Sequence, residues 1–373
     1  MLCRSVTDAT ISNLFLPWAH TAWTFRAPDT EGHLMRGTAP IVGGGIAGLG
    51  VARGLHARGW SVQVRERSAG PPRTGTALGM WPAAMAALDA LGVGDIIRDR
   101  SVEQSSAAIL RPDGSVIATV RSPSVHLVSR PDLLSTLLEG LPAETVAWNS
   151  PVHPTDDLSD ADVIVGADGI HSVVRTAVQP DAVPFPLGTV AFRGTAPGST
   201  GPITETWGRG LIFGITPQHP NATNWFACVR AELLNHHQPE LSATQLLRQL
   251  YGGWHPAIAR VLHTVEDAQV DRRTLLHLPP LRTYAGRRHV LVGDAAHAMA
   301  PNLGRGACES LVDAFTLAQA LTAAVSVEDG LRRYDRLRRS PTRHIAYLSR
   351  RLNRISSTER FTGVRDALVS ALA

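Results

Sequence analysis

The chain has 373 residues, of which 44% are hydrophobic and 18% are charged, and its formal net charge is +4. This length predicts about two domains with a proper core. Cys3, Cys228 and Cys308 are too few and too scattered for a disulfide framework or a metal site, so we expect no metal and a cytoplasmic location. All 36 basic residues are arginine, which excludes sites that need a phosphate-loop lysine or a Schiff-base lysine.

Residues 1–38 form an N-terminal extension unlike the rest of the chain. Ile11 to Phe25 is fairly apolar, but polar residues and a proline interrupt it. It therefore predicts neither a transmembrane segment nor a signal-peptide core. Because Met35 stands just before the first predicted strand, we expect residues 1–34 to be disordered or to reflect a misassigned start. A flexible arm that covers a partner is the alternative.

A strand, a helix and a strand are predicted from Ile41 to Glu66. The first turn reads Gly43-Gly44-Gly45-Ile46-Ala47-Gly48. Such glycines let the backbone approach a pyrophosphate, while the helix N-terminus points free N–H groups at it. Glu66 ends the second strand, at about the ~20-residue spacing of an acid that holds ribose hydroxyls. The unit predicts a dinucleotide site.

The next segments carry a second polar motif. A glycine-rich crossing and a short helix are predicted over residues 76–91, and a hairpin over 109–120 turns at Pro112-Asp113-Gly114-Ser115. Further on, an apolar strand runs into Ala167-Asp168-Gly169 and then a helix start. Gly169 can let a ligand or another backbone segment approach closely.

Residues 183–278 predict a sheet that faces an apolar cavity. Strands are expected near residues 189–193, 204–207, 211–215 and 225–230, with helices at 243–251 and 256–262. The candidate pocket residues are Phe192, Arg193, Trp207, Phe213 and Trp225. Alternate residues of a strand share a face, so these cannot all point inward, and the aromatic ones could instead be sheet core. Arg193 is the first choice for orienting a polar or anionic substrate.

A second glycine turn follows the last predicted strand of the dinucleotide unit. Val290 to Asp294 is followed by Pro301-Asn302-Leu303-Gly304-Arg305-Gly306. A plain nicotinamide enzyme would not need this acid and extra turn. Together with the first glycine motif they point to FAD and to redox chemistry.

The C-terminal region is rich in arginine. Ten arginines lie between Leu331 and Arg360, against Asp335 and Glu359. Apolar residues at helical spacing predict one or two amphipathic helices interrupted near Pro341. A solvated face that closes over the dinucleotide domain and a membrane-surface or anionic-partner role both stay open. With a net charge of only +4, no nucleic-acid partner is expected.

The three motifs in this order resemble those of the single-component (class A) aromatic-ring FAD monooxygenases, which include para-hydroxybenzoate and salicylate hydroxylases. The resemblance runs from about Ile41 to about Arg339. It implies an α/β fold with a Rossmann-like, glutathione-reductase-type FAD-binding domain, an inserted mixed β-sheet substrate domain and C-terminal helices. The expected boundaries are 39–182 and 279–325 for the FAD domain, with a substrate-side insert at about 74–120, then 183–278 for the substrate domain and 326–373 for the Arg-rich helices.

The resemblance also implies site residues. By matching the motifs, the ADP half of FAD is held by Gly43, Gly45, Ile46, Ala47, Gly48, Glu66 and Arg67, and the cofactor is contacted ahead of a helix by Arg130. Asp168 and Gly169 serve FAD and the reduced nicotinamide, while Gly293 and Asp294 lie beside the ribityl and pyrophosphate groups. The residues that lie against the flavin ring are Pro301, Gly304, Arg305 and Gly306. Arg305 stands where relatives commonly carry glutamine. It could sense negative charge on flavin or substrate, or point to solvent.

The implied reaction has two halves. NADPH or NADH reduces FAD, and O2 then gives a flavin C4a-hydroperoxide that hydroxylates an aromatic or polyketide-like small molecule in secondary metabolism. The expected assembly is a monomer or homodimer. Candidate catalytic residues are Arg193, His297 and Pro301, although a histidine one turn into a helix is more often a packing residue than an acid or base, and no general base is identified. A flavin-dependent epoxidase, a reductase and a catalytically inactive FAD-fold binding protein are the alternatives. The essential lysine of flavin-dependent halogenases is missing.

Two features depart from the family pattern. Pro40 falls in the strand expected at the centre of the sheet, where it would remove a ladder hydrogen bond unless it lies at the strand's start. The segment from Val146 to Asp162 is short, because relatives usually insert a β-meander there. We expect either reduced FAD affinity or a locally trimmed fold.

Overall fold

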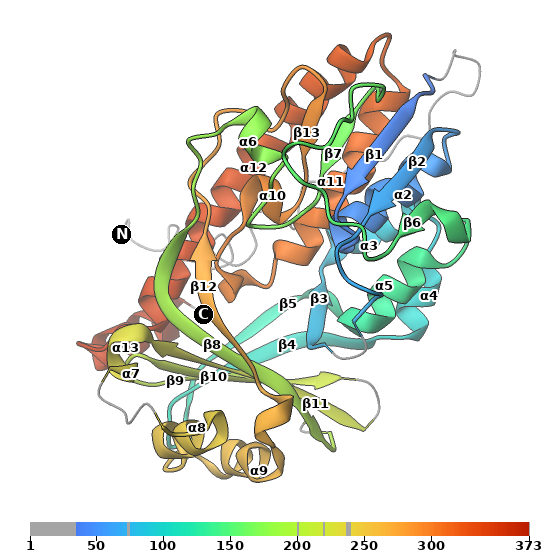
Figure 1. The fold of residues 1–373 in the computed structure, drawn as a ribbon. Coiled ribbons are helices and arrows are strands. Elements are labelled where there is room, and N and C mark those ends of the chain that lie inside the picture. Colours follow the sequence, from blue (N-terminus) through green and yellow to red (C-terminus); the bar gives the residue numbers. More distant parts are fainter. Residues whose placement is uncertain (1–34, 73–74, 200, 219–220, 236–239, 373) are drawn as a thin grey trace, which may run out of the picture.

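The computed structural model describes residues 35–72, 75–199, 201–218, 221–235 and 240–372. The predictions for residues 1–34 lie outside the described residues. Two sheets organise the chain, a parallel sheet packed between helices and a larger mixed sheet beside it (Figure 1). This is the predicted α/β fold with a second, mixed sheet and C-terminal helices.

The first sheet has five strands within the described residues, all parallel, in the order β13-β7-β1-β2-β6. Its central strand β1 has buried apolar side chains at Ala39, Ile41 and Val42, as expected for a strand covered on both faces. The strands are β1 (Thr38–Val42), β2 (Ser61–Arg65), β6 (Val146–Ala147), β7 (Ile164–Gly166) and β13 (His289–Leu291).

Helices surround this sheet and share its hydrophobic core. Glycines allow helices α2 and α11 to approach each other closely. A Cβ on Gly50 of α2 would lie 2.9 Å from the Cβ of Ala314 of α11, and a Cβ on Gly54 would lie 2.9 Å from that of Ala318. These small residues bring the helix that opens at the first glycine turn against the helix that opens at the second. The helices are α2 (Ile46–His56), α3 (Pro82–Ala90), α4 (Gly94–Asp99), α5 (Arg130–Leu138), α6 (Arg175–Val178), α10 (Asp294–His297), α11 (Gly306–Thr322) and α12 (Val327–Ser356).

The mixed sheet has the order β12-β8-β11-β10-β9-β4-β5-β3, and its pairs are antiparallel except for β4 with β9. Helices α8 and α9 cover the face that points away from the parallel sheet (Figure 1). The elements are β3 (Ala77–Met80), β4 (Val102–Leu110), β5 (Val116–Ser129), β8 (Phe185–Pro197), β9 (Ile203–Trp207), β10 (Leu211–Gln218), β11 (Ala222–Arg230), β12 (Asp271–His277), α7 (Ala231–Leu234), α8 (Ala243–Tyr251), α9 (Pro256–Thr264) and α13 (Thr362–Leu372); the 3-10 turns are η1 (Ala143–Thr145), η2 (Asp267–Gln269) and η3 (Pro301–Leu303).

The predicted β4–β5 hairpin is present and closes where the sequence places its turn. Ile109 pairs with Ala118 in the antiparallel register. The Arg111 N–H donates to the Ser115 carbonyl at 2.8 Å, and the Asp113 carboxylate accepts from the Ser115 N–H at 2.9 Å. Gly114 has φ of 88°, a conformation that favours glycine.

Pro40 lies in the central strand β1, but it comes before the residues of β1 that pair with β7. The Thr38 carbonyl accepts from Asp162 and Val163 on the β7 side. Alternate residues of a strand direct their backbone polar groups to the same side, so Pro40 also faces β7. The paired register between β1 and β7 starts at Ile41. The missing N–H of Pro40 therefore lies just before this ladder.

The shortened segment after β6 contains no strand between Ala147 and Ile164 among these described residues. Arg65 of β2 ties it to the parallel sheet, because its guanidinium contacts Asp156 at 2.8 Å, the Pro151 carbonyl at 2.8 Å and the Ser150 hydroxyl at 3.1 Å. Arg65 therefore holds this strandless segment against the parallel sheet, and a trimming relative to the family stays a prediction.

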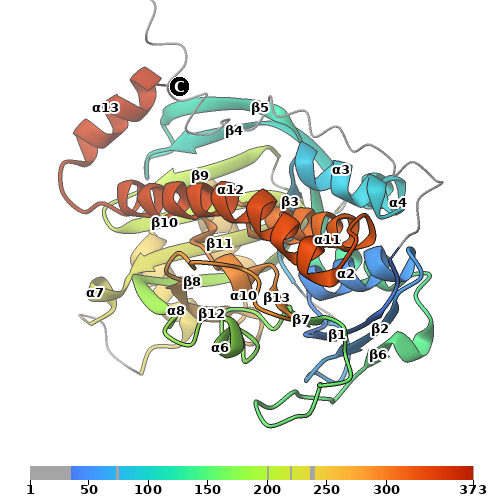
Figure 2. The same cartoon turned by 90° about the horizontal axis from the view of Figure 1, so that it is seen from above.

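The C-terminal arginine-rich segment forms one long helix, so the expected interruption near Pro341 was wrong. Helix α12 passes through Pro341 and crosses over the mixed sheet (Figure 2). The carbonyl that loses a donor belongs to Leu337, whose side chain is 37% exposed, so water can hydrate that side of the helix. Packing of the opposite face maintains the helix despite the proline.

Candidate functional site

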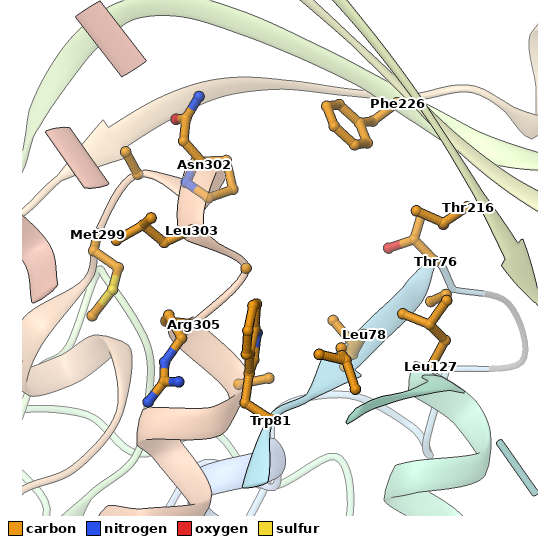
Figure 3. Close-up of a pocket in the computed structure, with 18 of the residues that line it drawn as sticks. Thr76, Leu78, Trp81, Leu127, Thr216, Phe226, Met299, Asn302, Leu303 and Arg305 are labelled. Carbon is orange, nitrogen blue, oxygen red and sulfur yellow. The ribbon is translucent and has the colours of Figure 1, made fainter. Parts of the chain in front are cut away.

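A cavity of about 1130 Å³ extends from the two glycine turns to the mixed sheet. Figure 3 shows its middle: Trp81 and Arg305 lie side by side, Leu78 and Leu127 line a second edge, and Phe226 projects from the mixed sheet across the space. A volume of this size suits a cofactor ring together with a small molecule.

The first glycine turn has the geometry of a phosphate cradle. Gly43 has φ of 104°, and a Cβ there would lie 2.4 Å from the Ala167 carbonyl oxygen, while a Cβ on Gly48 would lie 1.9 Å from the Gly43 oxygen. Gly45 faces the cavity instead, with no atom within 4 Å of its ideal Cβ position. It precedes α2, which has no side-chain cap, so the first N–H groups of that helix remain available for a phosphate.

Glu66 lies against the glycine turn. Its carboxylate accepts from the Gly44 N–H at 2.6 Å and from the Ser68 N–H at 2.8 Å. Burial raises the pKa of Glu66, but these N–H donors and nearby Arg67 more than offset it, so its pKa lies below the usual range. Arg67 itself is exposed. Each oxygen of an ionised carboxylate has a second lone pair, which leaves Glu66 able to accept ribose hydroxyls.

Replacing Glu66 with glutamine is expected to weaken FAD binding by roughly 10- to 100-fold, because a hydrogen bond to a charged group contributes about 1.5–3 kcal/mol. Titration of the apoprotein with FAD, followed by flavin fluorescence, measures the change. The exposed Glu144→Gln variant is the matched control and should bind FAD like the wild type. Equal affinity in the two variants would contradict the assignment of Glu66.

Asp168 has an unmet hydrogen-bond acceptor. Its Oδ2 accepts from the Val173 N–H at 2.7 Å and from the Val174 N–H at 3.4 Å. Its Oδ1 is buried and has no partner among the described residues. Buried oxygens are normally paired, but Asp168 does not line the cavity, although its neighbours Ala167 and Gly169 do. Gly169 beside it has φ of 78° with open space at its Cβ position, and it lines the cavity.

The second glycine turn ends at the N-terminus of α11. Pro301 opens η3, Gly304 adopts the left-handed conformation with φ of 61°, and Gly306 begins the helix with no side-chain cap before it. These three residues line the cavity together with Arg130 and Asp294. The helix N-terminus favours negative charge, which suits the reduced, anionic flavin.

Gly293 joins this turn to the helices behind it. Its φ is 58°, and its Cβ position lies 2.9 Å from the Cβ of Ala47 and 2.8 Å from the Ser310 hydroxyl. Its N–H donates to Asp313 at 2.9 Å. Of the residues carried over from the family motifs, those that line the cavity are Gly45, Ile46, Ala47, Arg130, Gly169, Asp294, Pro301, Gly304, Arg305 and Gly306; those outside its lining are Gly43, Gly48, Glu66, Arg67, Asp168 and Gly293.

A buried network of charged residues lies behind the second glycine turn. Arg338 of α12 contacts Asp313 and Glu309 of α11 at 2.6 Å each. Glu309 also holds Arg305 at 2.7 Å, and Asp313 holds His297 Nε2 at 2.6 Å. We call these five residues the ion network. Sequence reasoning missed it because its acids lie on a helix that reads as apolar and Arg338 lies among exposed arginines.

The ion network fixes Arg305 and His297. Arg305 lies over the Trp81 ring, 5.8 Å from its centroid, and its side chain is 15% exposed, so the solvent-pointing alternative is wrong. His297 is buried and lies outside the cavity lining. Burial lowers the pKa of His297, but Asp313 outweighs it and raises the pKa. This placement favours the packing role for His297.

The mixed sheet separates the five predicted pocket residues. Arg193 and Trp207 line the cavity, and Arg193 pairs with Asp271 at 3.0 Å. Phe192, Phe213 and Trp225 lie on the opposite face, packed against α8 and α9. Phe213 and Trp225 stack with centroids 5.9 Å apart, and Tyr251 packs edge-on against Phe213. These three residues are sheet core, so their assignment to the substrate site was wrong.

The structure adds cavity residues that the sequence did not single out for the site. Trp81 and Phe226 supply aromatic surfaces, and Glu205 places a carboxyl on the sheet wall. Ile345, Leu348 and Leu352 of α12 close another side. Their spacing of three and four residues marks the apolar stripe of that helix, so this stripe was the signal for a cavity wall.

Two findings bear on other functions. Within the described part of the chain, no helix is long and apolar enough to cross a membrane. The same residues contain no group of three or more His, Cys, Asp or Glu side chains placed to hold a metal ion.

Comparison with known proteins identifies the family. The model for the family described as "FAD binding domain" matches residues 37–148 and 154–347. Aurachin C monooxygenase/isomerase of Stigmatella aurantiaca is 30% identical over 81% of this chain and 85% of that protein. The 3-amino-4-hydroxybenzoate 2-monooxygenase of Streptomyces cremeus is 31% identical over 84% of this chain and 86% of its own length.

Solved structures support the same fold. Klebsiella pneumoniae HpxO, solved with FAD and uric acid, superposes with a TM-score of 0.80 at 21% identity, covering 90% of this chain and 92% of that one. At this identity the match shows the fold alone. On the family match and the curated relatives, the chain belongs to the FAD binding domain family and is an FAD-dependent monooxygenase, as the three motifs predicted.

Proposed function

We propose that this enzyme uses NADPH or NADH and O2 to hydroxylate a mostly apolar aromatic small molecule. The observation that carries the proposal is the single cavity that joins the cofactor-binding glycine turns to an apolar sheet wall. A cofactor at the turns and a substrate at the sheet would therefore share one continuous space. Exclusion of water from such a space protects a reactive oxygen donor.

The chain's own residues bind and position the cofactor. Gly43, Gly45 and Gly48 admit the pyrophosphate to the backbone, and Glu66 accepts ribose hydroxyls. The α11 N-terminus places positive electrostatic potential beside the ring site, and the ion network holds the Arg305 guanidinium at the cavity wall. When bound, FAD supplies hydride acceptance and activation of O2. Pro301 and Arg193 remain candidate catalytic residues by position, since both line the cavity.

The relatives support the substrate class. The protein of Stigmatella aurantiaca is named for aurachin C, and a relative of Pseudomonas aeruginosa, 30% identical over 78% of this chain and 82% of its own length, is a 2-heptyl-3-hydroxy-4(1H)-quinolone synthase. An apolar cavity wall with Ile203, Ile212, Leu275 and Leu352 fits an alkylated ring better than a small polar acid.

Turnover under labelled oxygen tests the proposal. FAD-loaded enzyme, NADPH or NADH, and ¹⁸O2 are incubated with alkylquinolones, phenols and polyketide-like aromatics, and products are analysed by mass spectrometry. We expect one ¹⁸O atom in the product of at least one aromatic compound. NAD(P)H oxidation without an oxygenated product would favour the reductase, an epoxide would favour the epoxidase, and no NAD(P)H oxidation would favour the inactive binding protein.

The domain boundaries, the cytoplasmic location and the monomeric or homodimeric state stay predictions from the sequence. The absence of a nucleic-acid partner stays a prediction as well. Size-exclusion chromatography with light scattering measures the oligomeric state directly.

A further inference from the structure

One carboxyl lies on the otherwise apolar sheet wall of the cavity. Glu205 lies on β9, and its direct neighbours across the sheet are Ile109 on β4 and Gly214 on β10. Gly214 in turn pairs with Phe226 on β11. Directly opposed residues share a face of a sheet, so the neighbours of Glu205 on the cavity face are apolar.

Gly214 lets an aromatic ring lie flat beside this carboxyl. A Cβ on Gly214 would lie 2.0 Å from the nearest Phe226 ring atom, so the ring occupies the space that a side chain would fill. Phe226 therefore lies over the backbone of the residue paired with Glu205, and Figure 3 shows its ring facing the open cavity. A flat ligand can stack on Phe226 and reach Glu205 at its edge.

The protein supplies few hydrogen-bond donors or cations to the Glu205 carboxyl. Its one hydrogen-bond donor among the described residues is the Trp207 indole N–H, 3.0 Å from Oε2. Arg193, the cation on the same wall, pairs with Asp271. Burial raises the pKa of Glu205, and the Trp207 hydrogen bond lowers it by less. The Glu205 carboxyl is half-buried at the cavity wall. A partly desolvated carboxyl is costly unless its hydrogen-bonding capacity is met, so a ligand donor would complete this site.

We propose that Glu205 accepts a hydrogen bond from a ring-borne N–H or O–H of the aromatic substrate. The site then selects neutral aromatics with such a donor and an apolar body. It disfavours aromatic carboxylates, because two negative charges in one low-dielectric space repel each other. The inference rests on the proposed function and specifies its substrate class.

Glu205→Gln tests the inference with almost no change in size. The Trp207 indole N–H can still donate to the amide oxygen of the new glutamine, which turns the amide NH2 group toward the ligand. The NH2 group would then face the N–H or O–H of the ligand, and two donors cannot form a hydrogen bond. The probes are 2-heptyl-4(1H)-quinolone and its N-methyl analogue, 4-heptylphenol and its methyl ether, and 4-hydroxybenzoate as the carboxylate. Their dissociation constants for FAD-loaded enzyme are measured from the change in flavin absorbance.

In the wild type, at least one donor probe is expected to bind roughly tenfold or more tightly than its methylated analogue. Glu205→Gln should weaken the donor probe by roughly 10- to 100-fold, leave the methylated probe within about threefold, and tighten 4-hydroxybenzoate. Glu266→Gln is the control, because Glu266 is exposed and lies beside α9, on the far face of the mixed sheet; it should change nothing.

Three results would overturn the inference. The first is that the wild type binds the donor probe and its methylated analogue equally well in both pairs. The second is that Glu205→Gln weakens the binding of the donor probe and of its methylated analogue equally. The third is that the wild type binds 4-hydroxybenzoate more tightly than either donor probe. The ¹⁸O2 experiment separates the two proposals. If an aromatic compound is oxygenated but donor dependence is absent, the proposed function stands and the inference about Glu205 fails.

Discussion

Replacing Gly45 with alanine is expected to abolish FAD binding at micromolar concentrations while leaving the fold intact. The ideal Cβ of Gly45 meets no protein atom within 4 Å, and the residue lines the cavity at the start of α2. Its φ of −80° and ψ of −172° are accessible to alanine. The added methyl group would therefore occupy the space through which a pyrophosphate approaches the backbone. We expect the FAD dissociation constant to rise by roughly 100-fold or more.

Titration with FAD and urea unfolding of the apoprotein separate binding from stability. The free energy of unfolding of apo Gly45→Ala should fall by no more than about 1 kcal/mol, which is the cost of losing glycine before a helix. Gly253→Ala is the control, because Gly253 is equally open but lies in the turn between α8 and α9. It should bind FAD normally. Normal FAD binding by Gly45→Ala would exclude this turn as the phosphate cradle.

Replacing Arg338 with methionine is expected to destabilise the protein by about 3–5 kcal/mol, because it leaves Glu309 and Asp313 buried without their shared cation. Arg338 is 1% exposed and contacts both acids at 2.6 Å. Urea unfolding at pH 7 measures the loss. Arg336→Met on the exposed face of the same helix is the control and should change the free energy of unfolding by less than about 1 kcal/mol.

The difference between wild type and Arg338→Met should narrow as the pH falls. In the wild type, burial raises the pKa values of Glu309 and Asp313, but Arg338 and their other cationic neighbours outweigh it, so both lie below their usual range. Carboxyls with depressed pKa values stabilise the folded state above their unfolded pKa, and this contribution disappears as they become protonated. A difference that stays constant from pH 7 down to pH 3, below the ordinary pKa of both carboxyls, would contradict the charge-based account.

The cofactor end of the site could be predicted from the sequence because its parts are local. The turn from Gly43 to Gly48, the acid at Glu66 and the second turn at Gly304 each follow a short apolar strand, and local spacing determines their geometry. In the structure Gly45 and Gly304 line the same cavity, and Glu66 lies behind the first turn, where it accepts from the Gly44 N–H. Strands β8 to β11 and helices α8 and α9 were likewise predictable from alternating and helical patterns, whereas β3 and β12 were not predicted.

The substrate end depends on which face each strand turns inward, and local sequence does not determine that. Phe213 and Trp207 lie on different strands with similar composition, yet one packs against α8 and the other lines the cavity. The register of β9, β10 and β11 decides the outcome. The ion network was missed for the same reason, because it joins α10, α11 and α12 across a tertiary interface.

Pro341 shows how packing overrides a local rule. The sequence predicts an interruption, since proline removes one helical hydrogen bond. In the structure Leu331, Tyr334, Arg338 and Ile345 are buried along one face of α12, and their contacts lie on both sides of the proline. Tertiary packing maintains one continuous helix there.

The most direct test of the central claim is the visible absorption spectrum of the purified protein, recorded before and after anaerobic addition of NADPH or NADH, with the released cofactor identified by chromatography. The account predicts an oxidised flavin spectrum, FAD as the released cofactor, and bleaching by at least one nicotinamide that accelerates when an aromatic ligand is present. A protein that binds no FAD even after reconstitution would contradict the account.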